Sequence, residues 1–359
     1  MCKLFLFPEA PDYKRGGYSM AVASDIKSLQ INSDDLVVFW TVDDSDENKI
    51  KISQFTNNRN IYFLRRKTSL EEKVFMLLRG KLHSIFWDLN FLNSLKNKYE
   101  ISSIFCGDTV FYPSVKKIFP DHEIHLRFHN LWLKIRARFL VSGKKFYSIK
   151  FVFIVWFLSR IELKTFSDSK VFQKIFINES DANMYHVLTC RSDFSVMNVV
   201  SDIRIWNAGI DLTLDDSKVL NLIWFGSVAS HTADGLKWFI RHVYKKLQKT
   251  NRIRVRLFLF GEGTKKFHQP SSNIFSFGRF DGDQIPMCGN GLFIVPDLSG
   301  GGTKLKVRYF IENNLHFITT PEGFEGYEEY NRKAEIYIIN AENWLSFLDN
   351  MYTELHFQM

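Results

Sequence analysis

Cysteine, proline and long apolar runs are all scarce in this sequence. Its 359 residues include 8 prolines and 4 cysteines, and the cysteines lie far apart, at Cys2, Cys106, Cys190 and Cys288. Without metal-site or redox-motif spacing, they are expected to be reduced thiols. The longest apolar run, Phe151–Leu158, is too short to span a bilayer. The first residues lack a small-residue cleavage site, so we expect no secretory signal and a cytoplasmic protein.

The rest of the composition is that of a large globular protein with a basic surface. A length of 359 residues favours two domains, and a 45% hydrophobic content with 35 phenylalanines is enough for sizeable cores. The formal net charge of +8 suits phosphate ligands, nucleic acid or an anionic membrane. The sequence has no helix-turn-helix, zinc or RNA-binding signature, so nucleic acid is not an expected partner.

Short apolar runs alternate with helical patterns along the first half of the chain. Strands are predicted over 3–7, 35–40, 60–64, 101–106 and 123–130, with a helix over 19–29. A glycine pair, Gly16 and Gly17, separates the first strand from this helix. The order of strand, glycine turn and helix is typical of an α/β nucleotide-binding fold, although turn chemistry alone also explains two glycines.

A glycine-rich segment in the second half carries the strongest chemical signal. An apolar strand over 291–295 is followed by Gly300, Gly301 and Gly302, and then by a helix that we expect Thr303 to cap and that runs to about Glu312. Glycines let a ligand approach the backbone, and a helix N-terminus attracts anions. Lys304 and Lys306 add charge in the first turns. The pattern predicts a phosphate site; a flexible turn is the alternative.

The order of these elements resembles the donor-binding segment of GT-B glycosyltransferases, in particular the large retaining group called family 4. The residues that fit that group's motif in register are Gly300, Gly302, Thr303, Lys304, Lys306, Val307, Thr319, Thr320, Pro321, Gly323 and Gly326. Further landmarks of the group are matched by Phe225-Gly226, by Gly278-Arg279 and by the Asn-Ala-Gly-Ile-Asp step over 207–211.

The resemblance implies an α/β protein of the GT-B fold class, with two Rossmann-like domains whose parallel sheets face a central cleft. It implies an acceptor-binding domain over 1–211, a nucleotide-sugar-binding domain over 212–340, and a helix over 341–359 that crosses back toward the first domain. The implied activity transfers a sugar from a nucleotide-diphosphate donor to a glycan or lipid-linked glycan of bacterial surface polysaccharide, such as O-antigen or capsule. It implies retention of configuration and requires neither a metal nor another cofactor.

The same resemblance implies the site residues. Those expected to bind the donor are Gly16, Gly17, Gly226, Gly278, Arg279, Gly301, Gly302, Thr303, Lys306 and Tyr309. Tyr309 stands where the group usually has a glutamate on the ribose, which indicates altered donor binding. Ser227 and Asp234 lie where the group carries basic residues for the diphosphate, so Lys304 becomes the leading catalytic cation.

Two polar residues on one predicted strand are the candidates on the acceptor side. Arg127 and His129 are two positions apart and therefore point the same way. They resemble the segment that brings an arginine or histidine into the cleft of sugar transferases, and we expect both to be catalytic. The alternative is a half-buried strand with a solvated polar face. Asp297 and Glu322 are candidates for hydrogen bonds to sugar hydroxyls.

Residues 131–172 mix aromatic and basic side chains. A basic, aromatic amphipathic helix is typical of a membrane interface, which favours peripheral contact with the inner face of the cell membrane over simple core packing. Two alternatives to a transferase keep the GT-B fold. One is a nucleotide-sugar epimerase, whose cleft carboxylates and histidines are not matched here, and the other is a non-catalytic or partner-dependent protein.

Overall fold

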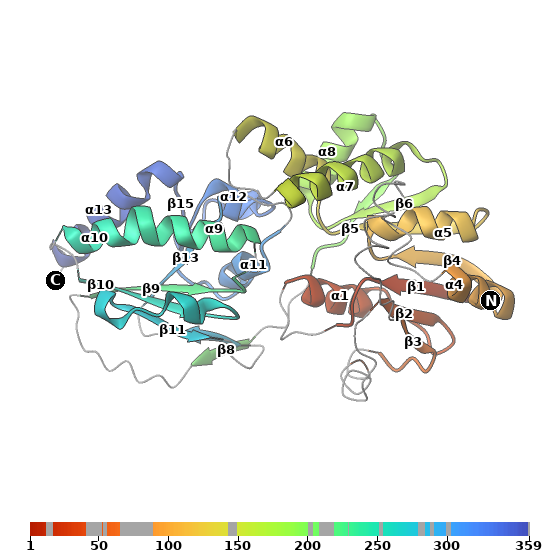
Figure 1. Cartoon of the computed structure of the whole chain (residues 1–359), viewed down its shortest axis with the longest axis horizontal. Helices are drawn as coiled ribbons and strands as arrows, with labels where there is room; N and C mark the ends of the chain where they lie inside the picture. The colour runs from red at the N-terminus through yellow and green to blue at the C-terminus, as the bar shows by residue number, and fades with distance from the viewer. Residues whose placement is uncertain are drawn as a thin grey trace. The chain divides into compact units, whose positions relative to one another are not determined.

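The computed structural model describes residues 1–11, 17–40, 52, 56–64, 89–142, 149–199, 204–207, 219–228, 230–250, 254–278, 284–287, 291–298 and 303–357. The chain divides into two compact units, Met1–Val200 and Ser201–Met359 (Figure 1). The boundary predicted at 211/212 falls within 208–218, which is outside the described residues.

Unit 1 is built on a seven-stranded parallel sheet. Its strands are β1 (Cys2–Phe7), β2 (Leu36–Trp40), β3 (Ile61–Leu64), β4 (Ile101–Cys106), β5 (Glu123–Phe128), β6 (Val171–Phe176) and β7 (Phe194–Val196). Their order is β3-β2-β1-β4-β5-β6-β7, with every pairing parallel. The five strands predicted in this half are confirmed to within two residues.

Helices connect the strands of unit 1. They are α1 (Gly17–Ser28), α4 (Leu89–Lys98), a short 3-10 turn η2 (Thr109–Phe111), α5 (Tyr112–Ile118), α6 (Trp132–Ser142), α7 (Ile149–Ser167) and α8 (Glu179–Thr189). The helical reading of 131–172 is thus confirmed as two helices. At its C-terminal end that segment also contains the first residues of β6.

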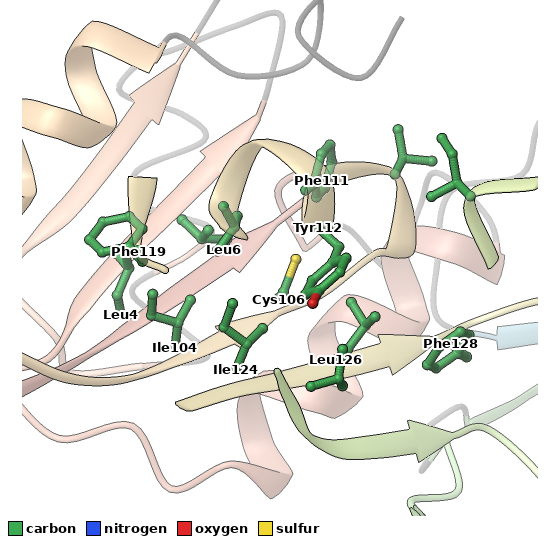
Figure 2. Packing of buried hydrophobic residues seen from close by; sticks show 14 of the residues in the cluster. Leu4, Leu6, Ile104, Cys106, Phe111, Tyr112, Phe119, Ile124, Leu126 and Phe128 are labelled. Carbon is green, nitrogen blue, oxygen red and sulfur yellow. The ribbon is translucent and has the colours of Figure 1, made fainter. Parts of the chain in front are cut away.

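Alternate residues of the strands pack on opposite faces of the sheet. Leu4 and Ile104 lie in one apolar cluster, which Figure 2 shows in close-up, whereas their chain neighbours Phe5 and Phe105 lie in another with Val22 of α1. This follows from the two-residue period of a strand. Because both faces are covered, the strands are almost continuously apolar, as expected for a buried parallel sheet.

Unit 2 repeats the same topology. Its strands are β9 (Val219–Phe225), β10 (Arg254–Phe260), β11 (Ile274–Gly278), β13 (Leu292–Val295), β14 (Phe317–Thr319) and β15 (Ile336–Ile338), in the parallel order β11-β10-β9-β13-β14-β15. Two further strands, β8 (Arg204–Asn207) and β12 (Gln284–Met287), pair with each other in a separate sheet.

The helices of unit 2 are α9 (Ser230–Phe239), which continues through the π-helical turn η3 (Ile240–Tyr244) into α10 (Lys245–Lys249), then α11 (Leu305–Glu312), α12 (Pro321–Phe324) and α13 (Trp344–Phe357). The tail helix α13 belongs to unit 2. Its Trp344 and Leu348 are fully buried there, and the ring of Trp344 lies edge-on to Phe239 with centroids 5.5 Å apart.

Each sheet reverses its strand order at one point. In unit 1 the reversal lies between β1 and β4, and in unit 2 between β9 and β13. Loops leave the two strands of such a pair in opposite directions, so the carboxyl ends of those strands are where open α/β sheets bind ligands. The candidate ligand sites are therefore the carboxyl ends of β1 and β4 and of β9 and β13.

Candidate functional site

In unit 2 the reversal point carries the glycine-rich segment that the sequence singles out. β13 ends at Val295, Pro296–Leu298 follow, and α11 begins at Leu305. Gly301 and Gly302 lie outside the described residues, as do Ser299 and Gly300. The phosphate-binding turn predicted at these glycines therefore stays a prediction.

The N-cap of α11 is Lys304, one residue later than predicted. Lys304 has the extended dihedrals of a cap, φ −87° and ψ 100°, so the expectation that Thr303 caps the helix is wrong. The Lys304 carbonyl accepts a hydrogen bond from the Tyr327 hydroxyl at 3.1 Å. Lys304 is only 9% exposed. The cap is thus held from the segment after β14, and Lys304 stands at the positive end of the helix dipole.

Lys306 is paired inside the same region. Its ammonium lies 3.4 Å from both carboxylate oxygens of Asp297 and 5.5 Å from the centroid of the Trp224 ring. The Asp297 side chain exposes no surface, and that of Lys306 is 11% exposed. Asp297, predicted to contact sugar hydroxyls, therefore offsets the charge of Lys306. That Lys304, at the N-cap, is the catalytic cation stays a prediction.

Thr320 joins the loops that follow β13 and β14. Its hydroxyl donates to the Asp297 carbonyl and accepts from the Gly323 N–H at 3.0 Å, which caps α12. A Cβ at Gly323 would lie 2.3 Å from Thr319 Oγ1, so only glycine fits there. The Thr-Thr-Pro-x-Gly pattern is thus explained by packing that fixes the position of Asp297.

Glycines also close the ends of β9, β10 and β11. Gly226, Gly261 and Gly278 have φ of 146°, 124° and 71°, a region that favours glycine. The Gly261 N–H donates to the Gly278 carbonyl at 2.6 Å, and a Cβ on Gly261 would lie 2.0 Å from the Gly226 carbonyl oxygen. Gly261 was not a predicted site residue, although its Gly-x-Gly step after a strand is a usable signal. The predicted Arg279 lies outside the described residues.

Tyr309 lies in the core. Its side chain is fully buried in an apolar cluster that includes Phe310, whose ring centroid is 6.4 Å away. The residue that stands in place of the usual ribose-binding glutamate therefore packs beneath α11. Its contact with a ribose stays a prediction.

The reversal point of unit 1 lies beside Gly107, which follows β4. The Gly107 N–H donates to the Leu6 carbonyl at 2.8 Å, and a Cβ there would lie 2.8 Å from the same oxygen. Only glycine lets the ends of β1 and β4 approach this closely. Of the predicted glycine pair, Gly17 is the first residue of α1, whereas Gly16 lies outside the described residues.

Arg127 and His129 come together at this edge, but in a buried cluster. The guanidinium of Arg127 exposes no surface; it donates to the carbonyls of Phe176 at 2.9 Å and Met197 at 2.7 Å. It also pairs with the Asp25 carboxylate of α1: Nη2 lies 2.9 Å from Oδ1, and Nε donates to Oδ2 at 3.2 Å. The alternative of a half-buried strand with a solvated polar face is therefore wrong, since the polar end of β5 is packed against α1; a catalytic role for the two residues stays a prediction.

His129 lies in the same cluster, with its Nε2 3.6 Å from Asp25 Oδ2. Burial, together with the charge of Arg127, lowers the pKa of His129 to about 3, despite a backbone hydrogen bond with Gly107. Burial raises the pKa of Asp25 to about 6, and Arg127 opposes that rise. The imidazole is therefore neutral at physiological pH. Asp25 was missed from the sequence, where its one signal is that it is the only carboxylate of α1.

Within the described residues, no group of three or more histidine, cysteine, aspartate or glutamate side chains could hold a metal ion. No helix described there is long and apolar enough to cross a bilayer.

Comparisons with known proteins show the fold. No family model and no curated protein matches the sequence. Among solved structures, sucrose-phosphate synthase from Thermosynechococcus elongatus superposes with a TM-score of 0.66 at 9% identity, covering 99% of this chain and 91% of that one. The apo lipopolysaccharide outer core galactosyltransferase WaaB gives a TM-score of 0.53 at 12% identity, with the same coverage.

A third structure, described as trehalose-6-phosphate from E. coli bound with UDP-2-fluoroglucose, gives a TM-score of 0.56 at 10% identity and covers 98% of this chain and 94% of that one. These neighbours are GT-B glycosyltransferases, and each matches over nearly the full length of this chain. Two parallel-sheet α/β units with these neighbours show that the chain has a GT-B fold.

Proposed function

We propose that this protein is a glycosyltransferase that moves a sugar from a nucleotide-diphosphate donor to a glycan or lipid-linked glycan acceptor. We propose further that it acts with retention of configuration in the synthesis of bacterial surface polysaccharide. The fold supports the first statement, since neighbours include a lipopolysaccharide galactosyltransferase and a complex with UDP-2-fluoroglucose. The family 4 resemblance of 300–326 supports the second.

The observation that carries the proposal is the construction of the β9/β13 reversal point. Lys304 caps α11 there, Lys306 and Asp297 form a pair, and Gly226 ends β9 in a conformation that favours glycine. A helix N-terminus with an adjacent lysine stabilises phosphate oxygens. A departing nucleoside diphosphate gains negative charge at the bond that breaks, so such a site stabilises the transition state more than the ground state.

The chain's own groups supply the remaining steps in this proposal. Unit 1 holds the acceptor near Gly107 and His129, at the end of its sheet. The neutral imidazole of His129 offers a hydrogen bond to a sugar or acceptor hydroxyl without adding charge. The donor binds to unit 2 through glycine amides and Lys304, and no step calls for a metal ion.

A lipid-linked acceptor is supported by the outer face of α7. Phe153, Trp156 and Leu163 are 61%, 45% and 46% exposed, and with Arg160 they recur at helical spacing along one side of the helix. The guanidinium carbon of Arg160 lies 4.7 Å from the Trp156 ring centroid. Exposed aromatic and basic residues on one helix face are typical of membrane-surface helices.

The charged residues of α6 and α7 are nearly all basic. Their basic residues are Lys134, Arg136, Arg138, Lys150, Arg160 and Lys164. Their one acidic residue, Glu162, is fully buried, where its two oxygens accept from the Trp132 and Leu133 N–H groups at 2.8 Å each. Lys134 is paired with Asp181 of α8 at 2.9 Å, whereas Arg160 and Lys164 are exposed on α7. These two residues place positive charge beside the exposed apolar side chains, which an anionic lipid surface complements.

The direct test is turnover of defined donors. The protein is incubated with UDP-glucose, UDP-galactose, UDP-N-acetylglucosamine and GDP-mannose, and released nucleoside diphosphate is measured with and without a lipid-extracted glycan fraction. The proposal expects release from at least one donor, stimulated by the glycan, and a product whose anomer matches the donor. No release from any donor, together with no rise in melting temperature with UDP or GDP, would contradict it.

A further inference from the structure

The buried cluster at the end of β5 is more elaborate than packing requires. The guanidinium of Arg127 donates to the Asp25 carboxylate of α1, to the carbonyl of the last residue of β6 and to the carbonyl of Met197, just after β7. It therefore ties one helix to the ends of three strands. A buried ion pair is often no more stabilising than apolar residues of the same volume, so stability alone does not account for it.

His129, the third residue of the cluster, indicates a role for the Asp25–Arg127 ion pair. The His129 side chain is 3% exposed and lies 3.6 Å from the Asp25 carboxylate, and the Gly107 backbone at the reversal point also interacts with it. Charged groups that act on the imidazole include Asp25 from α1 and Arg127 from β5. These contacts restrict the ring at the edge where the proposed acceptor binds.

We propose that Asp25 is a positioning residue, which together with Arg127 holds the imidazole of His129 in place at the carboxyl edge of unit 1. This inference rests on the proposed function for its kinetic part. Arg127 then acts through Asp25 and the strand ends without touching the substrate itself, and His129 is the residue that contacts it. Neutralisation of the Asp25 carboxylate by the guanidinium also leaves no net charge from the pair beside the ring.

The test compares Asp25→Asn with a matched variant at the opposite edge of the same sheet. Asp193 immediately precedes β7 and pairs with the fully buried Lys174 at 2.6 Å, although its own side chain is 37% exposed, so Asp193→Asn also leaves a buried charged partner unpaired in unit 1. The first readout is the Cε1–H resonance of His129, assigned by its loss in His129→Gln. We expect it to move in Asp25→Asn and to stay in Asp193→Asn. This readout needs no donor.

The second readout is kinetic, with the donor that the parent turns over fastest. Asp25→Asn should lower kcat at least tenfold and leave the KM for the donor within twofold, because the donor binds to unit 2. The double variant Asp25→Asn/His129→Gln should lose no more than His129→Gln alone, since residues that act as a unit are not additive. Asp193→Asn should keep the parent's kcat.

A further variant separates positioning from folding. Asp25→Leu/Arg127→Met replaces the ion pair by apolar side chains, and we expect it to fold with a melting temperature near that of the parent but with kcat at least tenfold lower. Full turnover in this variant, additive losses in the double variant, or an unmoved His129 resonance would overturn the proposal. If the parent turns over no donor, the proposed function fails, and the resonance alone decides whether Asp25 controls the imidazole.

Discussion

The side-chain ammonium of Lys306 lies 3.4 Å from the fully buried carboxylate of Asp297. The pair sits at the reversal point of the second sheet, where Lys306 also faces the Trp224 ring. Lys304, the N-cap of α11, is the other lysine of the first turn of that helix.

Lys304→Ala should weaken binding of UDP or GDP at least tenfold, equivalent to about 1.4 kcal/mol. The substitution removes a charged donor from the phosphates, and such bonds contribute about 1.5–3 kcal/mol. Isothermal titration calorimetry measures the affinity, and chemical denaturation measures the stability. A loss of stability as large as the loss of binding would instead make Lys304 a structural lysine.

The matched control is Lys333→Ala, because the Lys333 side chain contacts the C-terminal end of α11. The ammonium of Lys333 donates to the Ile311 carbonyl and to Asn314 Oδ1, both at 3.2 Å. It therefore serves the C-terminus of α11. We expect Lys333→Ala to lower stability slightly and to leave nucleotide affinity within twofold of the parent. Equal losses of affinity in both lysine variants would show a general effect of charge.

Gly261→Ala should destabilise unit 2 by about 1–3 kcal/mol for its backbone conformation, with a further loss because its Cβ would overlap the Gly226 carbonyl. Gly263→Ala should cost only about 1 kcal/mol, since its φ of 76° is in the left-handed region and its Cβ would meet a Val228 side chain at 3.3 Å. Urea denaturation of both variants checks the ranking. A reversed order would show that the loops after β9 and β10 are not packed as described.

His129 should make stability fall as the pH falls. Its folded pKa of about 3 lies below the ordinary histidine pKa of 6.5, so the folded state binds fewer protons. The contribution is fully present above about pH 6.5 and is lost as the pH falls toward 3, by about 1.4 kcal/mol per pH unit within that window. The free energy of unfolding of the parent should therefore drop more steeply than that of His129→Gln between pH 6.5 and 4. Parallel curves would contradict the buried, neutral imidazole.

The triple variant Phe153→Ser/Trp156→Ser/Leu163→Ser should lose binding to vesicles that contain anionic phospholipid. These side chains supply the apolar area of the α7 face, and Arg160 supplies charge beside them. The control is Val187→Ser/Leu188→Ser, which removes exposed apolar side chains, 76% and 53% exposed, from α8 of the same unit. Sedimentation with vesicles distinguishes the two. Equal binding by parent and triple variant would refute the membrane contact.

Much of the fold was predictable because its strands are short, buried and apolar. The predicted limits of β4 are those observed, and those of β1 and β2 differ by one residue. The strands β7, β12 and β15 have only three or four residues each, and no periodicity develops over so few residues, so the sequence does not predict them. The pairing of β8 with β12 was not predictable either, since nothing local specifies so distant a partner.

The site was predictable only where neighbouring residues build it. The segment over 303–326 predicts a phosphate site from its own order of residues, and the structure moves its helix cap by a single position. The cluster of Asp25 and Arg127 joins residues 102 positions apart, so no local pattern reveals it. Burial also changed the expected character of Arg127, which looks like a ligand contact in the sequence and is enclosed in the structure.

The central claim is that the reversal point between β9 and β13 binds a nucleoside diphosphate, and a crystal structure of the protein with UDP or GDP tests it most directly. The account predicts the pyrophosphate at the N-terminus of α11, with its oxygens within hydrogen-bonding distance of Lys304 and of the glycine turn that precedes it. A nucleotide bound away from Lys304, or no nucleotide bound at millimolar concentration, would contradict it.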